Sequence, residues 1–132
     1  PLFYAFKLFT NNCIGQSLDT YVQCETYDTG RFKDIPYLDV TSVYSESTKT
    51  VFINVINRHK DKAIATEITN NAPTVFAGKA QVSSIEGSLD EAFSYDKQNQ
   101  YAPKTKEIDV KNNKVVYAFP ANSLKQIAVK VK

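Results

Sequence analysis

The clearest pattern in the chain lies between Pro36 and His59, where apolar and polar residues alternate on both sides of a polar loop. The apolar positions recur at a period of two: Leu38, Val40 and Tyr44 before the loop, and Val51, Ile53 and Val55 after it. This period predicts an antiparallel hairpin. Phe52 and Ile56 are also apolar and lie on the opposite face of its second strand, which indicates a central strand buried on both faces. We expect Leu38, Val40, Val51, Ile53 and Val55 to be core, and residues 57–59 to form a strand-end turn.

The remaining segments predict one helix and several short strands. Leu2, Phe6 and Phe9 recur at helical spacing within Pro1–Asn11, and proline suits the first turn of a helix. Further strands are expected at residues 18–25, 63–69, 79–85, 106–110, 115–119 and 124–131. Asn112 and Asn113 are expected to turn a second hairpin between residues 106 and 119. The irregular connection over residues 88–103 is expected to insert four side chains into the core, namely Leu89, Phe93, Tyr95 and Tyr101.

Seven or eight short strands at nearly regular spacing predict the fold class. It is all-β, an antiparallel β-sandwich of jelly-roll type with seven or eight strands and one short N-terminal helix. A chain of 132 residues is one domain, long enough to hold a hydrophobic core. The chain opens on Pro1 and contains no Met. Removal of an initiator Met before Pro and excision from a longer chain explain this equally well, and we prefer the interpretation as a fragment.

Charge and hydropathy exclude two classes of partner. The net charge is only +2 and the basic residues are scattered, so the sequence predicts no nucleic-acid partner. No apolar run approaches the roughly 20 residues of a membrane-spanning helix, so no membrane partner is predicted either. No secretory signal pattern precedes the helix, and the compartment stays open between cytoplasm, periplasm and secretion.

The sequence gives little support for a catalytic residue. The six glutamates fall in turns and on polar strand faces, where solvated carboxylates are the expected reading: Glu25, Glu46, Glu67, Glu86, Glu91 and Glu107. His59 is the only histidine, with no ligand or nucleophile partner at a suitable spacing. Cys13 and Cys24 either form a bridge in an oxidising compartment or remain thiols. We therefore assign no catalytic, cofactor-binding or metal-binding residue.

Tyrosine is the residue type that favours binding. The chain holds eight tyrosines and no tryptophan. Rings on one exposed sheet face could stack on sugars, and Tyr21, Tyr44 and Tyr95 are the candidates. The alternative is that strand tyrosines are half-buried structural residues with a hydroxyl at the rim. Both readings stay open at the level of sequence.

Several stretches together resemble a known family. The opening PLFYAFKLFTNN, the hairpin PYLDVTSVYSESTKTVFINVINRH, Phe93 in the long connection, and the closing FPANSLKQIAVKVK are similar to the C-terminal segment of α-L-arabinofuranosidases of glycoside hydrolase family 51. In that family a (β/α)₈ barrel is joined to a β-sandwich, and two glutamates at barrel strand ends perform retaining hydrolysis. The resemblance places neither glutamate in this sequence.

The resemblance implies a non-catalytic accessory domain that stabilises the barrel of an enzyme acting on terminal arabinofuranosyl residues of arabinose-containing polysaccharides. Residues 1–12 would be the helical tail of a missing catalytic barrel, and residues 13–132 the sandwich. The barrel of the same parent chain is then the expected partner, with an arabinose-containing polysaccharide as a further one. A carbohydrate-binding module that uses exposed tyrosines is the alternative, and a free-standing all-β interaction protein is a third hypothesis.

Overall fold

The computed structural model describes residues 2–92 and 94–132. The elements are one α-helix, ten strands and one 3₁₀ helix. They are α1 (Leu2–Asn12), β1 (Gln16–Ser17), β2 (Thr26–Tyr27), β3 (Ile35–Pro36), β4 (Leu38–Ser45), β5 (Thr50–Asn57), β6 (Ile64–Thr69), β7 (Phe76–Glu86), η1 (Tyr95–Lys97), β8 (Lys104–Asp109), β9 (Lys114–Phe119) and β10 (Ser123–Val131). Seven of the strands have six residues or more, as the spacing of the pattern predicts.

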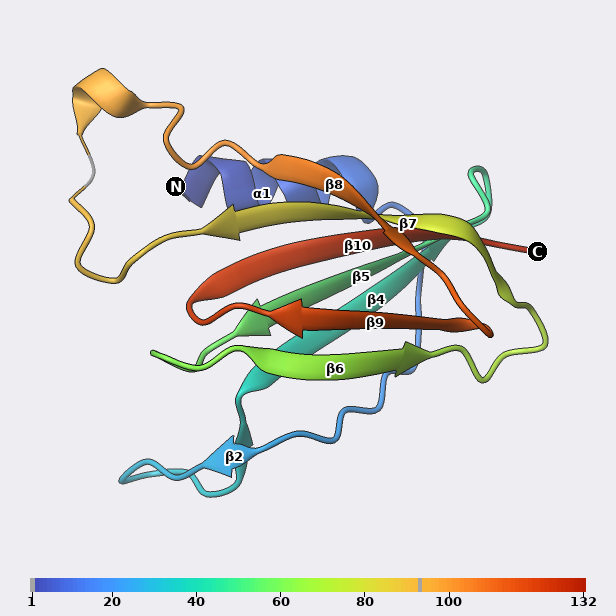
Figure 1. Cartoon of the computed structure of the whole chain (residues 1–132), viewed down its shortest axis with the longest axis horizontal. Helices are drawn as coiled ribbons and strands as arrows, with labels where there is room; N and C mark the ends of the chain where they lie inside the picture. The colour runs from blue at the N-terminus through green and yellow to red at the C-terminus, as the bar shows by residue number, and fades with distance from the viewer. Residues whose placement is uncertain (1, 93) are drawn as a thin grey trace.

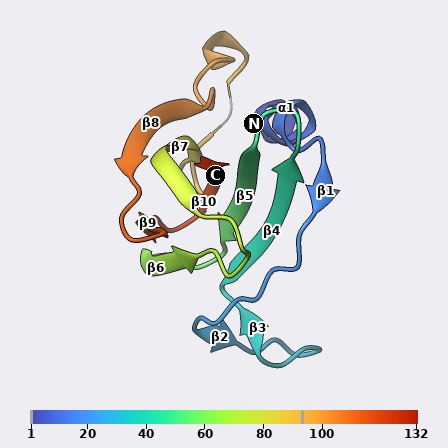
Figure 2. The same cartoon turned by 90° about the vertical axis from the view of Figure 1, so that its right-hand side faces the viewer.

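Two layers of antiparallel strands form a sandwich. The large sheet has the strand order β1-β4-β5-β10-β7-β8, and the small sheet consists of β6 and β9 alone. Figure 1 shows β6 and β9 lying in front of the large sheet, with α1 behind it. A second pair, β2 and β3, forms an arm over residues 26–36 that projects from the end of the sandwich (Figure 2). The predicted all-β sandwich with one short helix is confirmed.

The core lies between the two layers because alternate residues of each strand point inward. From the large sheet come Val51, Ile53, Val55, Val82, Ile127 and Val129, and from the small sheet Val115, Tyr117 and Phe119. The predicted hairpin is confirmed, with Val40 opposite Val55 and Leu38 opposite Asn57. Val40 is half-buried and packs against the rim of this core.

The outer face of the large sheet is covered in part by α1. Leu8 is the buried residue of this helix, and β5 has Phe52 half-buried and Asn54 buried on the same outer face. Strand β5 lies between β4 and β10, which confirms the prediction of a central strand. Its outer face is only partly covered, because Phe52 is half-buried and Ile56 is 36% exposed, so the prediction that both faces are buried is confirmed only in part.

The prediction of a second hairpin between residues 106 and 119 is wrong. Asn112 and Asn113 do turn the chain, with φ of 51° and 59°, a left-handed conformation that asparagine tolerates. The strands on either side nevertheless separate: β8 pairs with β7 of the large sheet, and β9 pairs with β6 of the small sheet. The turn therefore carries the chain from one layer to the other.

Two further expectations need correction. Residues 18–25 form no ladder, because the chain pairs with β4 only at β1 and then leaves that edge, keeping one bond from the Leu18 amide to the Ser42 carbonyl (3.0 Å). In the long connection Leu89 and Tyr95 are exposed rather than inserted into the core, since the connection extends beyond the layers (Figure 1). Tyr101 is half-buried and packs on Gly87. Phe93 lies outside the described residues.

Candidate functional site

Helix α1 presents an apolar surface to solvent. Its inward side buries Leu8 on the large sheet, whereas Leu2, Phe3 and Phe6 on the other side are 70%, 67% and 61% exposed. We call these three residues the apolar helix face. Side chains of this size are usually covered when they cluster, and clustered exposed apolar groups mark interaction surfaces.

The C-terminal end of α1 is fixed to the sheet by an amide cluster of Asn12, Cys13, Asn54 and Gln126. Gln126 accepts a hydrogen bond from Asn12 Nδ2 (2.6 Å), and its Nε2 donates to Asn54 Oδ1 (2.8 Å) and to the Leu8 carbonyl (3.3 Å). Asn54 Nδ2 donates to Cys13 Sγ (3.2 Å). Gln126 and Asn54 are both buried, so their amides need hydrogen-bond partners, and they find them in this cluster, at the Leu8 carbonyl and, for Asn54 Nδ2, also at Thr41 Oγ1 (3.2 Å). The helix is therefore held in one position on the sheet.

A cleft opens on the opposite side of the sandwich. Its floor is the inward face of β4 and β5, and its banks are residues 18–23 and residues 66–72. The volume is about 560 Å³, and aliphatic core residues line the floor: Leu38, Val40, Val51, Ile53 and Val55. The cleft exists because the small sheet has only two strands and leaves part of the six-stranded sheet uncovered.

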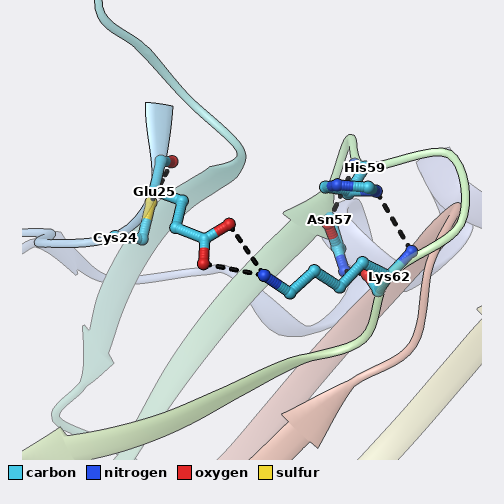
Figure 3. A network of polar contacts seen from close by, with 5 residues as sticks. All are labelled: Cys24, Glu25, Asn57, His59 and Lys62. Atoms are coloured by element: carbon cyan, nitrogen blue, oxygen red, sulfur yellow. Dashed lines mark hydrogen bonds and ion pairs between the residues drawn. The ribbon is translucent and has the colours of Figure 1, made fainter. Parts of the chain in front are cut away.

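A polar network occupies the end of β5 beside the arm, and Figure 3 shows its side chains. Asn57 Nδ2 donates to the carbonyls of Lys62 (3.1 Å), Phe119 (2.9 Å) and Pro120 (3.0 Å), and its Oδ1 accepts from the His59 amide (2.9 Å). His59 Nδ1 accepts from the amides of Asp61 and Lys62. The expected strand-end turn is thus present, with Asn57 joining β5 to the end of β9.

The arm is joined to the same network. Lys62 Nζ lies 2.8 Å and 3.0 Å from the two carboxylate oxygens of Glu25. This hydrogen bond and the charge of Lys62 lower the pKa of Glu25 below the usual range of a glutamate. The rings of Tyr27, Tyr37 and His59 stack in series, with centroids 4.7 Å and 4.5 Å apart. The network is structural, because its groups bond to one another and to the backbone.

The three candidate sugar-stacking tyrosines lie in different places. Tyr21 is 87% exposed on a bank of the cleft, whereas Tyr44 in β4 is half-buried and packs against the core. Tyr95 is 83% exposed in η1 of the long connection. The structure therefore does not assemble these three rings into one platform.

The described residues supply little catalytic chemistry. Within residues 2–92 and 94–132 no group of three or more His, Cys, Asp and Glu side chains is arranged to hold a metal ion. Glu46 is paired with Lys49, which lowers the pKa of that carboxyl, and Glu67 is paired with Lys114. Cys13 and Cys24 are free thiols. Over the same part of the chain no helix has the length and apolarity that crossing a membrane requires.

Sequence reasoning missed the buried amides of Asn54, Asn57 and Gln126. The available signal was an amide side chain inside an otherwise apolar strand, as in VFINVIN and LKQIAV. Such a group needs several partners when buried. Those partners come from segments far away in sequence, so the pattern could have indicated the need but not the contacts.

Residues 1–123 match the family model described as the α-L-arabinofuranosidase C-terminal domain. Intracellular exo-α-(1→5)-L-arabinofuranosidase 1 of Bacillus subtilis (strain 168) is 35% identical over 69 residues, which are 52% of this chain and 14% of the relative. This chain thus spans about one seventh of the length of that curated relative.

Two solved structures share the fold. The GH51 α-L-arabinofuranosidase of Thermotoga petrophila RKU-1 superposes with a TM-score of 0.83 at 24% identity, over 98% of this chain and 29% of its own. The GH51 arabinofuranosidase of Xanthomonas axonopodis pv. citri gives 0.79 at 15%, over 97% and 26%. With a family match over nearly the whole length and this shared sandwich, the chain belongs to the family of α-L-arabinofuranosidase C-terminal domains.

Proposed function

We propose that this domain packs on the catalytic barrel of a parent α-L-arabinofuranosidase through the apolar helix face and stabilises that barrel. The observation that carries the proposal is the combination found in α1. Its three large side chains face solvent, while the amide cluster holds the helix firmly on the sheet. A rigid, uncovered apolar surface is what a permanent interdomain contact requires.

The proposal divides the chain at the end of α1. Residues 1–12 act as the tail of the barrel, and residues 13–132 form the accessory sandwich. The solved relatives support a larger parent, since this chain spans 29% and 26% of their lengths. The parent enzyme hydrolyses terminal arabinofuranosyl residues of arabinose-containing polysaccharides, with its catalytic carboxylates on the barrel and none on this domain.

The test uses the full-length parent enzyme with Phe3→Ser and Phe6→Ser together. Burial of one phenylalanine is worth about 2 kcal/mol, so loss of both rings weakens the interdomain contact. We expect a lower temperature of heat inactivation and faster proteolysis between the domains, with KM unchanged. Phe32→Ser is the matched control, because Phe32 is similarly exposed, at 65%, but lies on the arm.

The contrary result is equally specific. Suppose that the double variant of the parent keeps the heat stability of the wild-type parent, and that the isolated 132-residue chain with the same two substitutions unfolds like the wild-type chain. The apolar helix face would then not be the contact. The unfolding measurement on the isolated chain matters because it detects any effect of the substitutions within the domain itself.

The exposed ring of Tyr21 favours a second function, binding of an arabinose-containing polysaccharide. Tyr21 borders the cleft together with polar residues of the opposite bank, Asn70 and Asn71. Titration of the isolated chain with arabinan oligosaccharides tests it. Saturable binding that Tyr21→Ala abolishes and Tyr95→Ala retains would support this function, and binding unaffected by Tyr21→Ala would contradict it.

A further inference from the structure

The turn that follows β5 contains a contact that depends on a proton. We propose that the charge of His59 controls how firmly the arm of residues 26–36 is attached to the sandwich. The neutral ring holds the arm in place, and protonation of the ring releases it. The groups involved are those of the network at the end of β5 (Figure 3), and none of them belongs to α1. This device therefore does not depend on the proposed contact with a barrel.

The first observation is the bonding of His59 Nδ1. This atom accepts hydrogen bonds from the backbone amides of Asp61 (3.1 Å) and Lys62 (3.0 Å), which close the turn after β5. An accepting Nδ1 requires a neutral ring with its hydrogen on Nε2. A charged ring carries hydrogen on both nitrogens, so rotation of the ring cannot restore an acceptor. Protonation therefore removes both bonds and sets a ring N–H against two amide N–H groups.

The second observation is that the same turn anchors both ends of the arm. Lys62 Nζ lies 2.8 Å and 3.0 Å from the carboxylate oxygens of Glu25, which directly precedes the arm. The ring of His59 packs on Tyr37, which directly follows the arm, and Tyr37 packs on Tyr27 within it. When the turn opens, Lys62 is no longer held opposite Glu25 and the His59 ring loses its fixed orientation.

The arm has few further anchors among the described residues. Its strands β2 and β3 have two residues each. At its base the Tyr37 amide donates to the Glu25 carbonyl (3.0 Å), and the Arg58 amide donates to the Tyr37 carbonyl (2.9 Å). Phe32 is 65% exposed and so adds little packing on the sandwich. Segments with few buried contacts open at low free-energy cost, so the loss of one anchor changes the mobility of the arm.

The charges nearest to the ring do not cancel this effect. Lys62 is the main cause of the lowered pKa of Glu25, through its hydrogen bond and its charge, and a charged His59 adds a smaller effect. Glu25 thus attracts a charged ring, whereas the ammonium of Lys62 repels it, and the pair has no net charge. Exposed ion pairs contribute little. The two amide bonds to Nδ1 therefore decide the preference for the neutral ring.

The other groups packed around the ring are balanced or uncharged. The turn adds the exposed side chains of Arg58, Lys60 and Asp61, and Arg58 pairs with Asp39 of β4 (3.7 Å), so two positive charges face two negative ones. Tyrosine side chains are neutral at physiological pH, and a tyrosine ring attracts a cation only weakly at an exposed site. The segment 120–123, which donates an amide to the His59 carbonyl (3.1 Å), has no charged side chain.

The sign of the pH dependence follows from proton binding. The attached arm uses the lone pair of the neutral ring, so it binds fewer protons than the released arm. Acidification therefore shifts the equilibrium toward the released arm. Histidine ordinarily changes its charge between about pH 5 and pH 8, whereas carboxylates ordinarily do so near about pH 4. The release of the arm is thus separated in pH from the titration of carboxylates.

Nuclear magnetic resonance of the 132-residue chain tests the coupling. His59 is the single histidine of the sequence, so its ring resonances report proton binding directly. From about pH 8 to about pH 5, the amide resonances of Asp61 and Lys62 should shift with the same midpoint as the ring. The protection factors of the Tyr37 and Arg58 amides should fall at least about fivefold. The order parameters of residues 28–34 should decrease toward the flexible range, below about 0.6.

Three variants separate His59 from its neighbours. His59→Asn supplies a side-chain oxygen that accepts from nearby backbone amides and does not titrate, so the pH step of the arm should vanish. His59→Phe keeps a ring on Tyr37 but has no acceptor, so the arm should be mobile at both ends of the pH range. Glu25→Gln leaves the bonds to Nδ1 in place, and the shifts of the Asp61 and Lys62 amides should persist. Unchanged protection of β5 and β10 shows that a variant keeps the fold.

Two results would overturn the proposal. One is a ring titration of the wild-type chain that leaves the order parameters of residues 28–34 and the protection of Tyr37 and Arg58 unchanged. The other is a pH step of the arm that persists in His59→Asn. Both are independent of the Phe3 and Phe6 substitutions, so failure of the barrel contact and failure of the pH-dependent arm are distinguished.

Discussion

Single buried polar residues decide much of the local geometry in this domain. Asn57 is 1% exposed, and one side-chain amide serves the carbonyls of Lys62, Phe119 and Pro120. These carbonyls belong to two segments that are about sixty residues apart in sequence. The side chain therefore connects the end of β5 with the turn that follows β9, and nothing apolar could replace it.

We expect Asn57→Leu to lower the free energy of unfolding by about 3 kcal/mol, because buried carbonyls lose their donor and remain unsatisfied. Urea denaturation of the isolated chain measures the change. Asn71→Leu is the matched control, since Asn71 is exposed, and it should change stability by less than about 0.5 kcal/mol. Equal effects of the two substitutions would show that the contacts of Asn57 do not matter.

Lys125 is a second buried polar residue, and it carries a charge that is paired with a carboxylate. It lies on the core face of β10 in line with Ile127, its side chain is 2% exposed, and its Nζ contacts Glu86 Oε2 at 2.8 Å. Glu86 is 48% exposed, so the carboxylate keeps part of its hydration while the ammonium does not. The pair is therefore asymmetric.

Removal of the two partners should have opposite consequences. Glu86→Ala leaves a buried cation without its partner, and we expect a loss of about 3 kcal/mol. Lys125→Met keeps the aliphatic stem and removes the charge, so stability should be unchanged or should rise by about 1 kcal/mol. Thermal unfolding of both variants tests this, and a larger loss in Lys125→Met than in Glu86→Ala would contradict it.

At the scale of elements, the attachment of α1 is the contact that orients the proposed docking surface. The helix buries one side chain, Leu8, on the sheet, which is little apolar contact for eleven residues. The amide cluster supplies the rest of the specificity through Gln126 and Asn54. Buried polar networks of this kind fix one arrangement of packed elements when every member is satisfied.

Gln126→Leu tests this attachment with a side chain of similar size. We expect the C-terminal turns of α1 to lose protection against hydrogen exchange, because the Leu8 carbonyl and Asn12 lose their partner, while β10 keeps its protection. Gln81→Leu on β7 is the matched control, because Gln81 is exposed. Uniform loss of protection throughout the sheet would instead indicate a global effect on stability.

At the scale of the whole molecule, two surface ion pairs contribute to the dependence of stability on pH. The pKa values of Glu25 and Glu46 are lowered by Lys62 and Lys49, chiefly through their hydrogen bonds. Carboxylates whose pKa is lower in the folded state stabilise it at neutral pH, and this contribution disappears as pH falls through their folded pKa values. Both groups are exposed, so salt screens the effect.

We therefore expect the urea midpoint of the isolated chain to fall on acidification below the ordinary range of glutamate titration. The double variant Glu25→Gln with Glu46→Gln should show a shallower fall at low ionic strength. At about 1 M salt, where the Debye length is about 3 Å, the two proteins should differ less. A variant that fell more steeply than the wild type would contradict the assigned direction of the pKa shifts.

The sequence by itself determined the class of fold and the hairpin of residues 36–59. The period-two pattern of residues 36–59 specifies a hairpin with a defined inward face, because a one-residue shift would expose Val51, Ile53 and Val55 together. The same pattern over seven segments specifies a sandwich. The resemblance in the opening helix, the hairpin and the closing strand indicated the family that the comparison then confirmed.

Only the tertiary structure decided which strands pair. Asn112–Asn113 forms the turn that its sequence predicts, yet β8 and β9 enter different sheets, since long-range partners outweigh the local turn. The open cleft and the amide cluster likewise depend on segments that are distant in sequence. Local periodicity reports which face of a strand is buried, and only the packed chain determines what covers it.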